Sequence, residues 1–195
     1  MKSFHSVLFG IVFFLITADC SSAQGSYRHF FEDGITRRLF KCRLEIAGQS
    51  LSGVLLVKRL GDFSFRAVYT AETGFTFFDI ALADDAAIFN SGVGPFKKKI
   101  IQRALAGVLQ SAILRPLDCA FKSGERQAWT CSRLRFEMNA VHSDEFPHRM
   151  GVFKGKKEQF SANFYFSHSR RQMPDSIRAV SDGLSLKMSF RLLDQ

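Results

Sequence analysis

The sequence predicts a mostly β domain of the α+β class. We expect a curved antiparallel sheet or incomplete barrel of about ten strands, with one long amphipathic helix on its concave side. Apolar and charged residues alternate from Phe40 to Ile46, the period of a strand with one buried and one solvated face. Similar segments recur with turn residues between them, as in an antiparallel meander. The segment after Pro95 has a helical period instead.

Residues 1–23 have the pattern of an export signal. Lys2 precedes an apolar run from Val7 to Ile16, which is too short to span a bilayer as a permanent helix. Two processing routes fit the small residues that follow: cleavage after Ala23, or acylation of Cys20 as a lipoprotein cysteine. Asp19 argues against acylation, because the lipoprotein pattern has a small neutral residue there. We therefore expect an exported protein.

Residues 24–37 are polar and contain glycine, which predicts a tether before a domain over residues 38–195. The first part of this domain predicts a meander. Glycine-containing turns separate the apolar segments at Gly48, Gly61 and Gly74. The predicted strands of this part are 40–46, 49–60, 63–70 and 75–82.

An amphipathic helix of about five turns is predicted next, beginning at Pro95 and ending before Pro116. Its apolar stripe must cover another surface, and the concave face of the sheet is the obvious partner. The apolar residues of the stripe are Phe96, Ile100, Ile101, Ala104, Leu105, Val108, Leu109, Ala112 and Ile113.

The rest of the chain returns to the strand period. Residues 141–149 are polar and predict a loop, and Asp182-Gly183 is a hairpin turn signal. The predicted strands are 117–122, 128–136, 150–153, 159–168, 176–180 and 184–192.

If Cys20 is removed or acylated, three cysteines remain in the exported part: Cys42, Cys119 and Cys131. A hairpin centred near Glu125 would place Cys119 opposite Cys131. An oxidising compartment would then permit a cross-strand disulfide. Two small buried apolar side chains fit the same spacing, since spacing alone does not define connectivity.

The chain is basic, with 27 Lys and Arg against 18 Asp and Glu and a net charge of +9. This charge would suit nucleic acid, anionic lipid or an acidic partner. Export makes nucleic acid the poorest of these, and we expect no nucleic-acid binding. The basic residues are spread along many strands, which favours a solvated surface.

No catalytic, metal or cofactor pattern is recognisable. His142 and His148 with Asp144 and Glu145 match no known ligand spacing, and a polar loop is the simpler interpretation. No serine lies in a G-x-S-x-G elbow, and Gly92-Val93-Gly94 lacks the rest of a phosphate-binding motif. We expect a protein that is not an enzyme and needs no cofactor.

Phenylalanine is abundant, with 22 residues in the chain, and most lie on predicted strands. One interpretation is an ordinary aromatic β core. The other is a wide apolar cavity between the sheet and the helix, able to take acyl chains. Composition does not separate the two.

The order of these segments resembles a family. The stretches Ser52–Lys58, Tyr69–Gly74 and Phe77–Ile80 are similar to the early strands of the outer-membrane lipoprotein sorting proteins, the LolA/LolB-like group, and of related uncharacterised envelope lipoproteins. The helix over 95–113 and the late order from Pro174 to Phe190 also fit. The resemblance spans roughly Leu39 to Leu193 as an order of elements.

The resemblance implies an incomplete barrel capped by helix, with an apolar cavity for acyl chains, in the periplasm or on the periplasmic face of the outer membrane. One long helix is recognisable here, whereas the family has more than one. The carrier's buried arginine and the receptor's protruding apolar loop residue have no matching position.

We therefore expect non-enzymatic binding of an acyl chain, lipid or lipoprotein anchor, with membrane association through Cys20 if that residue is acylated. The alternative is an envelope scaffold with a solid core and a basic outer face. The candidate cavity residues are Phe65, Phe77, Phe78, Ile101, Leu105, Val108, Leu109, Phe136, Phe164 and Phe166.

Overall fold

A computed structural model describes residues 30–31, 34–61, 64–83, 87–113, 126–131, 134–139, 146–168 and 173–193. Within 126–139, side chains are described for Glu137 and Met138. The described strands form one antiparallel sheet in the order β5-β4-β3-β2-β1-β11-β10-β9-β8-β7-β6. Their bounds are β1 (Arg37–Ile46), β2 (Gln49–Arg59), β3 (Phe65–Ala71), β4 (Thr76–Leu82), β5 (Ala87–Gly92), β6 (Arg126–Cys131), β7 (Leu134–Asn139), β8 (Arg149–Lys154), β9 (Lys157–Tyr165), β10 (Ser176–Ser181) and β11 (Leu186–Leu192).

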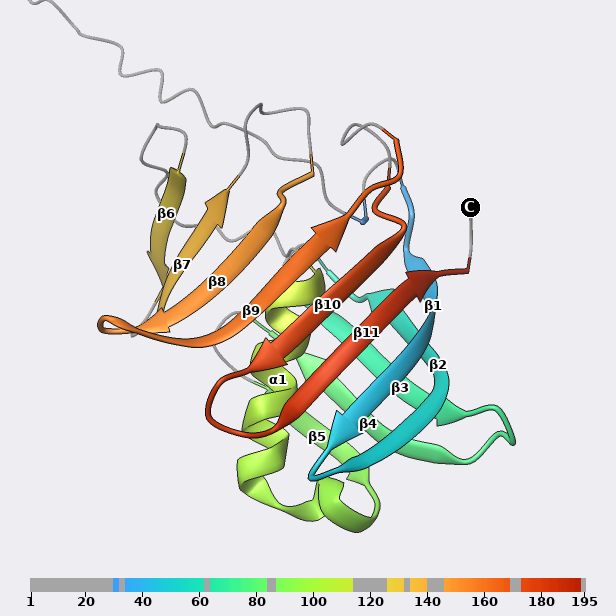
Figure 1. Ribbon diagram of the computed structural model, residues 1–195. Coiled ribbons are helices and arrows are strands. Elements are labelled where there is room, and N and C mark those ends of the chain that lie inside the picture. Colours follow the sequence, from blue (N-terminus) through green and yellow to red (C-terminus); the bar gives the residue numbers. More distant parts are fainter. Residues whose placement is uncertain are drawn as a thin grey trace, which may run out of the picture.

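Two meanders make up the sheet, β1 to β5 and β6 to β11, and β1 pairs with β11 to join them. This central pairing runs from Phe40 opposite Leu192 to Ile46 opposite Leu186. The inward residues of both strands alternate with exposed ones, so the sheet has one buried face. The sheet curves around the helix and stays open between β5 and β6 (Figure 1).

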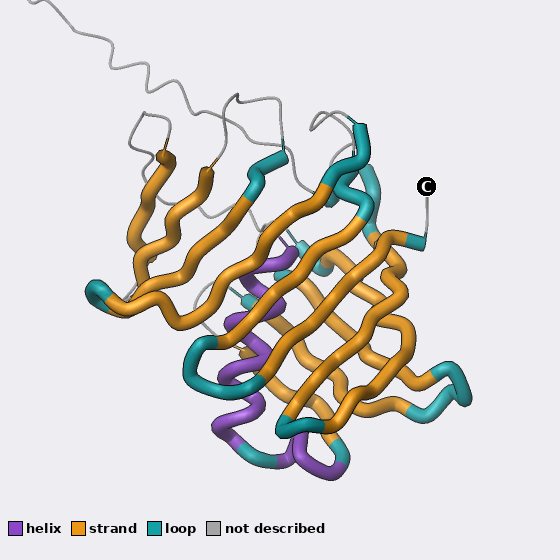
Figure 2. Tube along the Cα trace, in the orientation of Figure 1, coloured by secondary structure: helices purple, strands orange, loops and turns teal. Residues whose placement is uncertain are grey.

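The helical segment lies on the concave face, as the sequence predicts (Figure 2). It begins with a 3-10 turn, η1 (Gly94–Lys97), and continues as α1 (Lys99–Ile113). Lys98 between them has an extended backbone, with a ψ of 124°. Pro95 therefore starts a separate turn, and α1 has 15 residues, about four turns. Its main contacts are with β9 and β10.

The predicted fold class is confirmed, but two details of the strands are wrong. β5 was missed because it is short and mostly exposed, without a clean alternation. The strand predicted over 128–136 is the hairpin of β6 and β7, in which Cys131 lies opposite Leu134. Residues 132 and 133 are Ser and Arg, which carry no glycine or proline signal for a turn.

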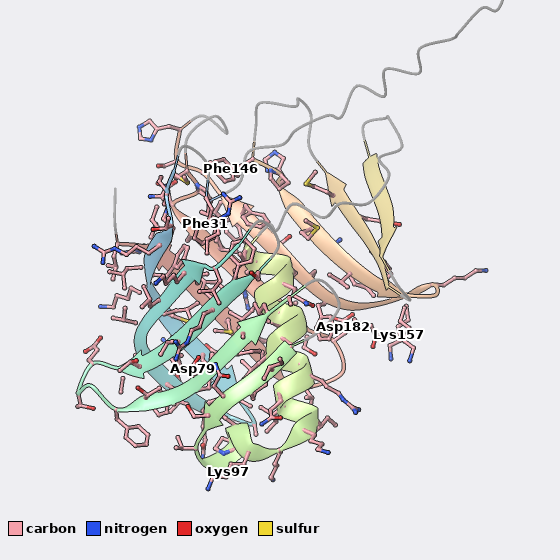
Figure 3. The ribbon with its side chains drawn as sticks, turned by 180° about the vertical axis from the view of Figure 1, so that it is seen from behind. Phe31, Asp79, Lys97, Phe146, Lys157 and Asp182 are labelled. Carbon is pink, nitrogen blue, oxygen red and sulfur yellow. The ribbon has the colours of Figure 1, made fainter. Side chains whose placement is uncertain are left out.

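Two predicted polar segments contribute to the core. Phe30 and Phe31, from the segment predicted as a tether, are buried to 1% and 2% exposure, so packing begins before residue 38. Phe146, in the segment predicted as a polar loop, is fully buried. Figure 3 shows Phe31 and Phe146 at the end of the molecule opposite to Lys97. Apolar residues isolated among polar ones give no periodic signal, which is why the sequence pattern missed them.

Candidate functional site

The space between α1 and the concave face of the sheet is an apolar interior. Seven of the ten candidate residues are buried there: Phe65, Phe78, Ile101, Leu105, Val108, Leu109 and Phe164. Phe77 and Phe166 are partly buried against the same core. Phe136 lies on β7, and its side chain is outside the described residues.

The part of this interior that the described residues enclose is filled. The described cavity inside it leaves about 10 Å³ in which a water-sized sphere could be centred, so it holds about one water at most. It is lined by aromatic and aliphatic side chains from the segment before β1, from the strands and from the C-terminal end of α1: Phe30, Phe31, Phe40, Leu55, Val57, Ala112, Ile113, Ile177 and Phe190. With the helix in this position, the cavity bounded by these described residues has no room for an acyl chain.

Aromatic rings occupy both ends of the interior. At one end, Phe30 contacts Phe40 and Phe146 with ring centroids 5.6 and 5.4 Å apart. At the other end, Phe78 contacts Phe96 with centroids 5.4 Å apart, and Tyr69 stacks on Phe77 at 5.3 Å. Such edge-to-face and offset contacts add to the free energy of apolar burial.

The described polar side chains Tyr69 and Cys42 in the interior are uncharged. The Tyr69 hydroxyl donates a hydrogen bond to the carbonyl oxygen of Leu51 at 2.8 Å, and burial raises its pKa. Burial likewise raises the pKa of the Cys42 thiol, which stays protonated and packs as a small apolar group. Asp79 is the one charged residue buried among the described residues, and it points to the other face of the sheet. Chemically, this interior can recognise hydrocarbon and little else.

A surface groove runs along the opposite side of α1, between the helix, β5 and β9. Its volume is about 440 Å³, within the range of ligand sites. One wall is a helical stripe with a spacing of three and four residues: Lys99, Gln102, Arg103, Ala106, Gly107 and Gln110. Ala87 and Phe89 of β5 and Phe160 of β9 provide the other walls.

The helix and β9 meet at the floor of this groove. A Cβ atom placed on Gly107 would lie 2.3 Å from Cε2 of the Phe160 ring. Glycine therefore allows the ring to pack directly on the helix backbone. In the sequence, the polar residues Lys97, Lys98, Gln102, Arg103 and Gln110 lie off the apolar stripe of the predicted helix. The adjacent small residues Ala106 and Gly107 are the sequence feature by which close packing against the helix could have been predicted.

An ion pair on the outer face of the sheet holds β5 beside the groove. Arg66 of β3 donates from Nε to Oδ1 of Asp79 at 3.0 Å and from Nη2 to Oδ2 at 2.5 Å. The Asn90 amide of β5 donates to the same carboxylate at 3.1 Å. Hydrogen bonding by Arg66, with a contribution from Asn90, holds the pKa of Asp79 below its usual value despite burial.

One exposed turn has the residue types of a hydrolase but not the geometry. Ser167 Oγ lies 3.0 Å from Nδ1 of His168, its neighbour in sequence. Asp175 instead accepts a hydrogen bond from the Ser167 backbone N–H, and it does not hydrogen-bond to the histidine ring. Hydrogen bonding by Ser167, through its side chain and then its backbone, lowers the pKa of the Asp175 carboxyl. This arrangement closes the turn between β9 and β10.

Several predicted sites fall outside the described part of the chain. Cys20, Cys119 and the side chain of Cys131 are outside it, so the disulfide stays a prediction. Of the histidine-rich loop, His148 is described, exposed beside the Phe166 ring. In the described ranges, no three His, Cys, Asp or Glu side chains gather to hold a metal. No helix in those ranges is long and apolar enough to cross a membrane.

Solved structures of other proteins are similar to the structure of this chain. A LolA superfamily protein from Nitrosomonas europaea is similar, with a TM-score of 0.44 and 9% identity over 82% of this chain and 84% of that one. A DUF1329 family protein from Desulfovibrio piger is similar with a TM-score of 0.45 and 8% identity over 83% and 85% of the two chains. The first belongs to the group that the order of elements resembles. No protein-family model matches the chain, and no curated protein matches it.

Proposed function

We propose that this protein binds the acyl chain of a lipid or lipoprotein anchor between α1 and the concave face of the sheet, without catalysing a reaction. The observation that carries the proposal is the interior itself: a curved, aromatic-lined face with no buried charge among its described residues, covered by one amphipathic helix. Hydrocarbon is the ligand chemistry that such a surface accepts.

Binding between α1 and the described residues of the sheet requires α1 to move, because the cavity among those residues is filled. The extended residue Lys98 separates α1 from η1 and is the natural place for a hinge. The candidate residues Phe65, Phe77, Phe78, Phe164 and Phe166 would then form the wall of the opened cavity, together with Phe136.

The exchange of helix for ligand is close to balanced. The large apolar side chains of α1 each stabilise the closed form by about 1.5–3 kcal/mol, or roughly 8–15 kcal/mol for the five of them. They are Ile101, Leu105, Val108, Leu109 and Ile113. An acyl chain of about 15 methylenes recovers a similar amount, at about 0.8 kcal/mol each. A ligand can therefore replace the helix without a large net cost.

The proposal places this activity in the cell envelope. The export signal over residues 1–23 is the support for that location, and Cys20 would add a lipid anchor if it is acylated. The intact mass of the mature protein tests this directly. A mass matching a chain that begins at Gln24 means a soluble periplasmic form, and a diacylated chain that begins at Cys20 means an anchored one.

The binding test is titration of the mature protein with a fluorescent fatty acid, together with native mass spectrometry for lipid that co-purifies. We expect saturable binding near one equivalent, competed by unlabelled lipid. Ala104→Leu separates interior binding from surface adsorption. Ala104 is on the buried side of α1, so the larger side chain weakens docking of the helix by about 1–3 kcal/mol.

A less firmly docked helix lowers the cost of opening, so Ala104→Leu should bind the fatty acid several-fold more tightly while its stability falls. The sequence placed Ile100 in the apolar stripe of the helix, but its side chain is 60% exposed. Ile100→Leu is therefore the control and should change neither quantity. Weaker binding by a folded Ala104→Leu protein would contradict a site under the helix.

The filled interior favours a second function, an envelope scaffold with a solid core that binds acidic partners through its basic outer face. This function predicts no co-purified lipid and no saturable binding of the fluorescent fatty acid. The same titration therefore decides between the two.

A further inference from the structure

We propose that the groove between α1, β5 and β9 holds the anionic head group of the acyl ligand, with Lys99 and Arg103 as the recognising cations. This inference rests on the proposed function and adds the class of ligand, a single-chain or acyl-anchored amphiphile with a carboxylate or phosphate head. The fully buried described residues of the interior include no charged group for such a head. Arg38 and Arg59, half-buried at its edge, donate hydrogen bonds to the carbonyl oxygens of Phe30 and Phe31, whereas the cations of the groove are exposed.

The two cations have no ion-pair partner among the described residues. Lys99 and Arg103 are exposed, and neither forms an ion pair with a described residue. They are four residues apart on one helix face, where like charges repel each other. An anion between them would relieve this repulsion and form charge-assisted hydrogen bonds.

The rest of the groove has the composition expected for the start of a hydrocarbon tail. Beyond Arg103 the helical stripe becomes small and apolar at Ala106 and Gly107, facing the partly buried rings of Phe89 and Phe160. From Lys99 to Gln110 the stripe extends about 16 Å, at 1.5 Å per residue. The groove is therefore basic at one end and apolar along its floor, as an anionic amphiphile requires.

The groove also lies next to the proposed route into the interior. The contact of Phe160 with Gly107 forms both the groove floor and the junction between α1 and β9. A tail in the groove reaches the interior once that junction opens, while its head group remains beside Lys99 and Arg103. The head group is therefore recognised on one side of α1 and the tail on the other side.

The test compares laurate with monolaurin, which has the same tail and no charge, at pH 8 and low salt. Binding is measured by displacement of the fluorescent fatty acid from the mature protein. We expect laurate to bind about fivefold to tenfold more tightly, with the preference falling as salt is added. The Lys99→Gln/Arg103→Gln variant should lose this preference and bind monolaurin as before.

Lys187→Gln/Arg191→Gln is the matched control. It removes the same charge from exposed positions of β11 and should keep the preference for laurate. Equal binding of laurate and monolaurin by the unmodified protein, or an unchanged preference in Lys99→Gln/Arg103→Gln, would overturn the head-group site and leave acyl binding intact. Binding of neither would overturn the proposed function as well. Displacement of laurate by inorganic phosphate at equal concentration would show that the groove binds any small anion. That result would overturn the proposal that the ligand is an anionic amphiphile.

Discussion

The two sides of α1 meet opposite surroundings. The side that faces the sheet packs Leu105, Val108 and Leu109 at 0% exposure against aromatic rings, with almost no free volume. The other side lines an open groove of about 440 Å³ with Lys99, Arg103 and two glutamines. A stable helix needs only the first side, because apolar burial supplies most of its stability.

The composition of the second side is therefore not fixed by helix stability. It differs from that of an ordinary solvated face in two features. It carries no acidic residue to balance its cations, and it has a glycine, Gly107, at the point where the Phe160 ring packs on the helix backbone. The comparison teaches that one helix separates a space suited to hydrocarbon from a surface suited to charge. Each side can be tested by substitutions that leave the other unchanged.

The largest expected effect is on the filled side. Phe31→Ala should lower the free energy of unfolding by about 3–5 kcal/mol, because it removes a fully packed ring next to the small residual cavity. The enlarged cavity is apolar and should bind benzene or xenon. Urea denaturation measures the loss, and a rise in melting temperature with benzene measures the new binding.

Phe75→Ala is the control for this prediction, since Phe75 is 53% exposed in the turn between β3 and β4. It should cost less than about 1 kcal/mol. A loss below about 1 kcal/mol for Phe31→Ala would mean that the segment around Phe31 does not belong to the folded core.

This result would also bear on what the sequence can and cannot predict. Strands with a clean period of two, such as β1 and β11, and the helix were predictable because each exposes one face and buries the other. The inward residues Phe65, Phe78, Leu105 and Phe164 followed from that periodicity. Phe31 and Phe146 had no periodic context and were missed.

The groove could not be predicted for a different reason. It combines side chains from β5, α1 and β9, and the distance between these elements depends on how the sheet curves. The polar face of the helix was visible in the sequence, but its second wall was not. Nothing in the sequence indicates that Phe160 and Phe89, which pack against the edge of the core, also line the groove beside α1.

A smaller effect is expected on the outer face, where Arg66, Asp79 and Asn90 hold β5 beside the groove. Asp79→Asn should lower the free energy of unfolding by about 1–2 kcal/mol at neutral pH, since hydrogen bonds lose their charge assistance. The pKa of Asp79 is lower in the folded protein than in the unfolded chain. Its stabilising contribution is therefore complete above the unfolded pKa of about 4 and is lost as the pH falls through the folded pKa.

The measurement is urea denaturation of both proteins between pH 7 and pH 2.5. The difference in stability should narrow with acidification, because the unsubstituted protein loses its ion pair while the asparagine is unaffected. A constant difference across this range would mean that the effect of the substitution is steric. Glu45→Gln, which alters an exposed pair with Arg43, should show little effect at any pH.

The smallest effect is expected where the two sides of the helix meet. Gly107→Ala improves helix propensity by about 1 kcal/mol, but its new Cβ displaces the Phe160 ring. All three nearest atoms belong to that ring, which is partly exposed and can turn into the groove. The two effects oppose each other, so the net change should stay within about 1 kcal/mol.

In a Phe160→Ala background the ring is gone, and Gly107→Ala should then stabilise the protein by up to about 1 kcal/mol. Denaturation of the four proteins of this cycle gives the coupling between the two residues. A cost above about 2 kcal/mol for Gly107→Ala, unrelieved by Phe160→Ala, would mean that the helix backbone itself is pressed against β9, and that this junction cannot open by moving one ring.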